Sequence, residues 1–118
     1  MKKIEAFIRH EALEQIHDAL VARGLPSMSV SEVKGTGRQA GFTENYRGSR
    51  RDVFLRPKLK LEIVVDDADA ERVIDTVLEL AHTGEPGDGK IFVFEVAEAI
   101  RVRTGERGPL VLESHPVD

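Results

Sequence analysis

Cysteine and tryptophan are absent from this chain of 118 residues, and aromatic residues make up only 5% of it. Without cysteine, disulfide bonds and thiolate metal sites are excluded. No apolar run approaches the roughly 18 residues of a membrane span, and the N-terminal stretch lacks a signal-peptide core, so we expect a cytoplasmic protein. The net charge of −4 argues against a general nucleic-acid or membrane binder. What remains, 41% hydrophobic and 32% charged residues, is typical of one globular domain over residues 1–118.

Hydrophobic periodicity predicts two similar halves, each a strand, a helix and a second strand. Alternating apolar residues predict half-buried strands over 2–9, 27–34 and 58–65. Apolar spacings of three and four predict amphipathic helices over 11–23 and from Asp67, which would cap its helix, to Gly84, which would end it. The apolar run 91–96 is typical of a buried strand. An extended piece would follow through Arg103, and then a turn or short helix.

This order of elements predicts an α+β fold, the ferredoxin-like βαββαβ sandwich. In that fold a four-stranded antiparallel sheet carries two helices on one face. The other face would carry Phe7, Val33 and Val64 among charged residues. We expect self-association to bury that face.

Residues 35–56 interrupt the pattern with four glycines, five arginines and no sustained periodicity. A connection this long inside a compact domain is usually functional or disordered. Its basic character in an acidic chain suggests either an acidic partner or simply a solvated loop.

A second unusual stretch places Gly84, Gly87 and Gly89 directly before Lys90. Glycines let a backbone approach a ligand closely and point its N–H groups inward, so the stretch predicts an anion site with Lys90 at its edge. It also matches the start of a P-loop, but Ile91 stands where that motif requires Ser or Thr. A strand rather than a helix follows, which excludes the P-loop.

Several segments of the chain resemble the PII signal-transduction family: MKKIEAFI at the start, EVKGTGRQAG at 32–41, YRG at 46–48, PKLKLEIVV at 57–65, and TGEPGDGKIFVFEVAEAIRVRTGE at 83–106. The resemblance runs over about residues 1–106. It implies a ferredoxin-like homotrimer that regulates other proteins and is not an enzyme. It also implies that residues 36–56 form a projecting T-loop, which docks onto targets, and that residues 107–118 form a flexible tail.

The resemblance further implies that ATP or ADP binds in a cleft between subunits. There 2-oxoglutarate would chelate a Mg²⁺ ion held by the ATP phosphates. Gln39 would supply an oxygen to the metal, and Lys58 would pair with the distal carboxylate of 2-oxoglutarate. The ligand-binding positions carried over are Ser29, Gly35, Thr36, Gly37, Arg38, Gln39, Lys58, Glu62, Val64, Gly87, Asp88, Gly89, Lys90, Arg101 and Arg103.

The implied function is a sensor of nitrogen, carbon and energy status that controls an ammonium transporter or nitrogen-assimilation proteins. The tip Tyr46-Arg47-Gly48 would contact the target, with Arg47 entering an ammonium channel. The tyrosine that is uridylylated in many bacterial members is Arg51 here, so we hypothesise that uridylylation does not regulate this protein. Ser49 occupies the position phosphorylated in cyanobacterial relatives and is the candidate modification site.

Several alternatives remain open at this point. On residue pattern alone, Arg101 and Arg103 are either anion ligands or the solvated face of an edge strand. An RNA-binding ferredoxin-like domain is disfavoured by the negative charge, and an acylphosphatase-like enzyme by the lack of a paired acid and base. The more serious alternative is a PII-like sensor of an adenylyl nucleotide or of bicarbonate. Retention of Gln39 and Lys58 favours 2-oxoglutarate.

Overall fold

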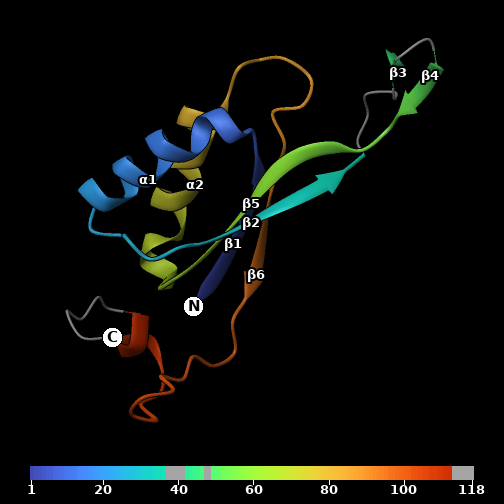
Figure 1. The fold of residues 1–118 in the computed structure, drawn as a ribbon. Helices are drawn as coiled ribbons and strands as arrows, with labels where there is room; N and C mark the ends of the chain where they lie inside the picture. Colours follow the sequence, from blue (N-terminus) through green and yellow to red (C-terminus); the bar gives the residue numbers. More distant parts are fainter. Residues whose placement is uncertain (37–41, 47–48, 113–118) are drawn as a thin grey trace.

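The computed structural model describes residues 1–36, 42–46 and 49–112, with the backbone alone for 42–46 and 49–53. Four strands form one antiparallel sheet in the order β2-β5-β1-β6: β1 (Lys2–Ile8), β2 (Ser29–Gly35), β5 (Arg56–Val65) and β6 (Lys90–Glu95). Helices α1 (Leu13–Ala22) and α2 (Asp67–Ala81) cover one face of this sheet (Figure 1). The predicted α+β, ferredoxin-like sandwich is confirmed.

The core lies between the helices and the sheet, as the alternation predicts. Its fully buried members come from every second residue of β1 and β5 and from one stripe on each helix. The largest of them are Ile4, Ile8, Leu61 and Ile63 from the strands, and Ile16, Leu20, Val73 and Val77 from the helices.

Both ends of α2 differ from the prediction. The capping residue is Asp66, whose carboxylate accepts a hydrogen bond from the Asp67 backbone N–H at 2.8 Å. Asp67 is instead the first helical residue, and its carboxylate lies 2.9 Å from the Met1 α-amino nitrogen. The helix ends at Ala81 rather than at Gly84, because the backbone of His82 is already extended.

The prediction that residues 91–96 form a buried strand is wrong for the single chain. Strand β6 is an edge strand with β1 on one side, and Phe92, Val93 and Phe94 are each 47–48% exposed. The sheet face away from the helices is called here the open face. On it, the rings of Phe92 and Phe7 pack edge to face, with their centroids 6.1 Å apart. Burial of this face by another copy of the chain stays a prediction.

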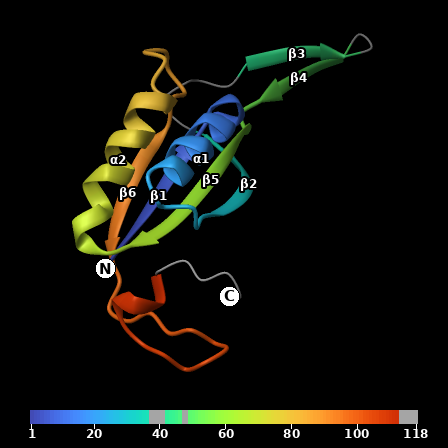
Figure 2. The same ribbon diagram turned by 90° about the vertical axis from the view of Figure 1, so that its left-hand side faces the viewer.

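Within the long connection, strands β3 (Phe42–Tyr46) and β4 (Ser49–Val53) pair into a two-stranded antiparallel ribbon. The ribbon projects away from the sheet beyond the ends of β2 and β5 (Figure 2). Sequence periodicity could not reveal these strands, because a ribbon without a core behind it needs no alternation of apolar and polar residues.

The chain after β6 turns back on itself instead of extending through Arg103. Residues 102–104 form a turn, and Ile100 pairs with Arg107 in an isolated antiparallel bridge. A short 3-10 helix, η2 (Pro109–Leu112), follows and agrees with the predicted turn or short helix. Residues 113–118 of the tail lie outside the described residues. Among the described residues, neither α1 nor α2 combines the length and the apolar character of a membrane-spanning helix.

Candidate functional site

A cavity of about 820 Å³ opens where β2 and β5 leave the sheet toward the ribbon. Residues 83–89, within the connection between α2 and β6, are called here the glycine loop, and residues 85–89 of this loop line one side of the cavity. Four cationic residues contribute to its wall: Lys34, Arg56, Lys58 and Lys90. The cavity is large enough for a small-molecule ligand, and its charge suits an anion.

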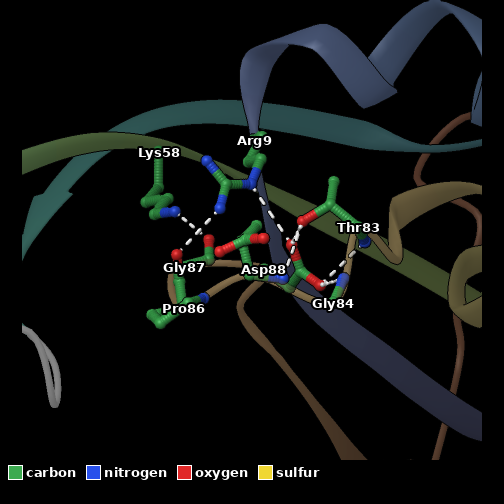
Figure 3. A network of polar contacts seen from close by, with 8 residues as sticks. Arg9, Lys58, Thr83, Gly84, Pro86, Gly87 and Asp88 are labelled. Atoms are coloured by element: carbon green, nitrogen blue, oxygen red, sulfur yellow. Dashed lines mark hydrogen bonds and ion pairs between the residues drawn. The ribbon is translucent and has the colours of Figure 1, made fainter.

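Asp88 organises the glycine loop from inside (Figure 3). Its carboxylate accepts hydrogen bonds from the Thr83 hydroxyl and from the backbone N–H groups of Thr83 at 2.8 Å and Gly84 at 2.9 Å. Arg9 Nε approaches the same carboxylate at 3.3 Å. These donors, the Thr83 hydroxyl foremost, hold the pKa of Asp88 far below its usual value. Because its carboxylate is bonded to Thr83, Gly84 and Arg9, Asp88 stabilises the conformation of the loop.

Two further cations hold carbonyl groups of the glycine loop (Figure 3). Arg9 Nη2 donates to the Pro86 carbonyl oxygen at 2.8 Å, and Lys58 Nζ donates to the Gly87 carbonyl oxygen. Burial, followed by the nearby charge of Arg9, lowers the pKa of Lys58. Sequence reasoning missed Arg9 because the residue simply follows the last apolar position of a strand. The only available signal was its place as the last residue of the strand predicted over residues 2–9.

Besides the predicted role in binding an anion, the backbone conformation of this loop itself requires glycine at two positions. Gly87 and Gly89 both have φ near +100°, where other residues are strained. At Gly89 an added Cβ would also collide with the Phe7 backbone. Lys90 begins β6 and pairs in register with Phe7.

Three predicted residues, Val64, Arg101 and Arg103, line a second cavity of about 550 Å³. The second cavity lies at the opposite end of the sheet from the first. Lys90 of the first cavity pairs with Phe7 near the end of β1, whereas Val64 of the second cavity pairs with Lys3 near its start. The Arg101 guanidinium is largely buried there, with Nη1 2.7 Å from Glu106 Oε1. In one chain, the predicted ligand residues thus form two separate groups.

Ser29 and Glu62 belong to the second group by position, since they form a register pair between β2 and β5 two residues from Val64. The Glu62 carboxylate lies 2.8 Å from Lys3 Nζ and 3.5 Å from Lys60 Nζ. The hydrogen bond from Lys3, the main cause, lowers the pKa of Glu62.

The first group contains Gly35 and Thr36 together with Lys58 and the Gly87–Lys90 segment, all of which line the first cavity. Gly37, Arg38, Gln39, Arg47 and Gly48 lie outside the described residues. Tyr46 and Ser49 are backbone partners at the end of the ribbon, and Arg51 pairs with Glu44. Within residues 1–36, 42–46 and 49–112, no cluster of His, Asp and Glu is arranged to hold a metal ion.

The structure defines a class, a ferredoxin-like domain whose inserted ribbon stands beside a basic, glycine-lined cavity. The model of the family "Nitrogen regulatory protein P-II" matches residues 1–106, so the chain belongs to the P-II family. This membership confirms the resemblance noted from the sequence. Since the family is named for nitrogen regulation, the chain belongs to a family of regulatory proteins and not of enzymes.

Curated relatives agree over nearly the whole chain. The nitrogen regulatory protein P-II 1 of Methanothermobacter thermautotrophicus is 53% identical over 108 residues, covering 92% of this chain and 94% of the relative. The nitrogen regulatory protein P-II of Rhodospirillum rubrum is 52% identical over 108 residues, covering 92% and 96%. The nitrogen regulatory protein P-II 1 of Escherichia coli K12 is 52% identical over 106 residues, covering 90% and 95%.

Proposed function

We propose that this protein senses nitrogen, carbon and energy status by binding ATP or ADP, and 2-oxoglutarate with Mg²⁺, between the subunits of a homotrimer. It controls target proteins, such as an ammonium transporter or nitrogen-assimilation proteins, through the T-loop at residues 36–56, which contains the ribbon. The observation that carries this proposal is the separation of the ligand residues into two groups at opposite ends of one sheet.

The separation supports a site shared between subunits. Strand β1 has seven residues, so its two ends are about 20 Å apart at the usual rise per residue. One nucleotide contacts both groups only if a neighbouring copy brings its second cavity to the first cavity of this chain. The exposed apolar residues of β6, Phe92, Val93 and Phe94, provide a surface for such a neighbour.

The chemistry of the first cavity suits phosphates and a dicarboxylate. Lys90 and the glycine-loop backbone would hold phosphate oxygens, and Lys58 would pair with the distal carboxylate of 2-oxoglutarate. Magnesium prefers hard oxygen ligands, which the phosphates, 2-oxoglutarate and the Gln39 side chain would supply. Because Lys58 is partly desolvated, its attraction to a carboxylate is stronger than in bulk water.

The position of the cavity explains how ligands would act on a target. Gly35, Thr36 and Arg56 stand where β2 and β5 pass into the ribbon, and all three line the cavity. Ligands that bind one ribbon conformation better than another shift the ribbon toward that conformation. The tip, Tyr46-Arg47-Gly48, would then fit or miss the target protein. Ser49 beside it would be the candidate modification site, with Arg51 in place of the uridylylated tyrosine.

Calorimetry tests this function directly. We expect ATP to bind alone and 2-oxoglutarate to bind only when Mg-ATP is present. Lys58→Ala should abolish 2-oxoglutarate binding while ATP still binds. Lys60→Ala is the matched control, because Lys60 lies two residues further along the same strand and does not line the cavity. Indifference to adenine nucleotides would refute the proposal, and a response only to bicarbonate or adenylyl nucleotides would favour the alternative sensor.

A further inference from the structure

The guanidinium group of Arg101 is engaged by a carboxylate of its own chain. Glu106 Oε1 lies 2.7 Å from Arg101 Nη1, within the geometry of a strong charge-assisted hydrogen bond. The Arg101 side chain is only 9% exposed, whereas the Glu106 side chain is 44% exposed. The arginine is therefore fixed in the protein, while its carboxylate partner has solvent to move into.

The turn between the two residues is built to present this carboxylate. The Arg101 backbone N–H donates to the Glu106 carbonyl oxygen at 2.9 Å, and the Gly105 N–H donates to the Arg101 carbonyl oxygen at 2.7 Å. The Thr104 hydroxyl donates to Glu106 Oε1 at 2.7 Å, the same oxygen that Arg101 contacts. Two donors thus converge on one carboxylate oxygen, which makes a small anion site whose occupant is part of the chain.

A phosphate group offers Arg101 the same kind of oxygen ligand. Guanidinium groups bind carboxylates and phosphates through the same N–H donors, so the two anions compete for them. A nucleotide phosphate that reaches Arg101 in the second cavity must either displace Glu106 or share the guanidinium with a repelling carboxylate. Both possibilities lower nucleotide affinity relative to a chain without that carboxylate.

We infer that Glu106 is an internal competitor that occupies Arg101 until a nucleotide phosphate displaces it. This inference rests on the proposed nucleotide binding and adds a regulatory contact to it. Displacement releases the side-chain bond between Arg101 and Glu106, one of the bonds that hold the 101–106 turn. Nucleotide binding is thereby linked to the conformation of the segment that leads into η2.

The variant Glu106→Gln tests the competitor, because its neutral amide keeps the shape of the side chain and bonds Arg101 more weakly. We expect its Kd for Mg-ATP to fall about fivefold, within the range for exchanging one charge-assisted hydrogen bond. We also expect its melting temperature without nucleotide to fall, because the ion pair is lost. A purely structural role for Glu106 would weaken both properties, so opposite signs distinguish the two roles.

A double-mutant cycle separates competition from a general charge effect. In an Arg101→Gln background, Glu106→Gln should no longer tighten binding, since there is no guanidinium left to release. A nonspecific gain from removing a negative charge would persist in that background. Thr104→Val, which removes the second donor to Glu106 Oε1, should tighten binding by less than Glu106→Gln does.

The outcomes distinguish this inference from the proposed function. Wild-type protein that binds Mg-ATP while Glu106→Gln binds it equally or more weakly overturns the internal competitor alone. If neither protein binds Mg-ATP, the competitor falls together with the proposed function. Binding by Glu106→Gln but not by wild type supports the competitor in its strongest form.

Discussion

A Cβ atom added at Gly89 would stand 1.7 Å from the carbonyl oxygen of Phe7 and 2.8 Å from the carbonyl carbon. Both Phe7 atoms belong to the backbone of β1, which is held by β5 on one side and β6 on the other. Neither atom can therefore move aside as a flexible side chain would. The glycine loop is thus pressed directly onto the sheet, and only the residue without a side chain permits this contact.

Gly89→Ala should consequently be among the most destabilising single changes in the loop. The positive φ costs about 1–2 kcal/mol for alanine, and the collision adds a further roughly 1–3 kcal/mol. Gly24→Ala is the matched control, because Gly24 has φ +79° but nothing within 4 Å of an added Cβ. Urea unfolding measures both changes. Equal losses in the two variants would show that the contact with Phe7 is not rigid.

The fold was largely predictable because most of the sheet is half-buried. Residues 4, 6 and 8 and residues 59, 61, 63 and 65 alternate in sequence as they alternate in burial. Strand β6 departs from this pattern, because a continuous apolar run such as Ile-Phe-Val-Phe does not indicate which of its side chains the single chain buries. The ribbon strands escaped prediction because no core face imposes a period on them.

The candidate site could be predicted in its residue types but not in its connections. The glycines and Lys90 predict an anion site. No spacing in the sequence, however, indicates that Arg9 donates a hydrogen bond to the Pro86 carbonyl, 77 residues away in the chain. The engagement of Arg101 by Glu106 was equally hidden, because the sequence suggested an extended segment where the chain turns. Such contacts depend on tertiary packing rather than on local pattern.

Asp88→Asn should make stability less dependent on pH. The donors around Asp88 lower its folded-state pKa, so the carboxylate stabilises the protein above the unfolded-state value of about 4. That contribution is lost as the pH falls below about 4, toward the lowered folded-state pKa. Wild type should therefore unfold at a higher urea concentration than Asp88→Asn at pH 7, and the gap should narrow at pH 3.

Asp75→Asn is the control for this comparison, because Asp75 is an exposed carboxylate on α2. Its unfolding midpoint should stay near that of wild type at pH 7. A gap between wild type and Asp88→Asn that is constant from pH 7 to pH 3 would mean that the carboxylate charge does not stabilise the loop.

Leu61→Ala should lower the free energy of unfolding strongly, because Leu61 belongs to the core side of β5. Leu61 is fully buried, and it lies between β1 and β2 in the middle of the sheet. Removing a buried leucine leaves a cavity, so the free energy of unfolding should fall by about 3 kcal/mol. Lys60→Ala, the adjacent change on the open face, should alter it by less than about 1 kcal/mol. Similar losses in both variants would place the core elsewhere.

The strongest prediction concerns sites built from two chains. One variant, Lys90→Ala, loses a cation of the first cavity, and another, Arg101→Ala with Arg103→Ala, loses the arginines of the second. Neither variant alone should bind Mg-ATP at a concentration that saturates wild type. When the two are unfolded together and refolded, random assembly pairs an intact first cavity with an intact second cavity at about one interface in four.

Mixing should therefore recover about a quarter of the wild-type binding capacity, measured by calorimetry after native mass spectrometry has confirmed mixed trimers. No single chain in the mixture carries both cavities intact. Recovery is therefore possible only if one chain supplies the first cavity of a site and a different chain supplies the second. Recovery should disappear when each variant is refolded separately and the two are then combined without exchange. If mixed trimers form and recover nothing, the nucleotide site lies within one chain, and the two cavities at opposite ends of the sheet do not cooperate in binding.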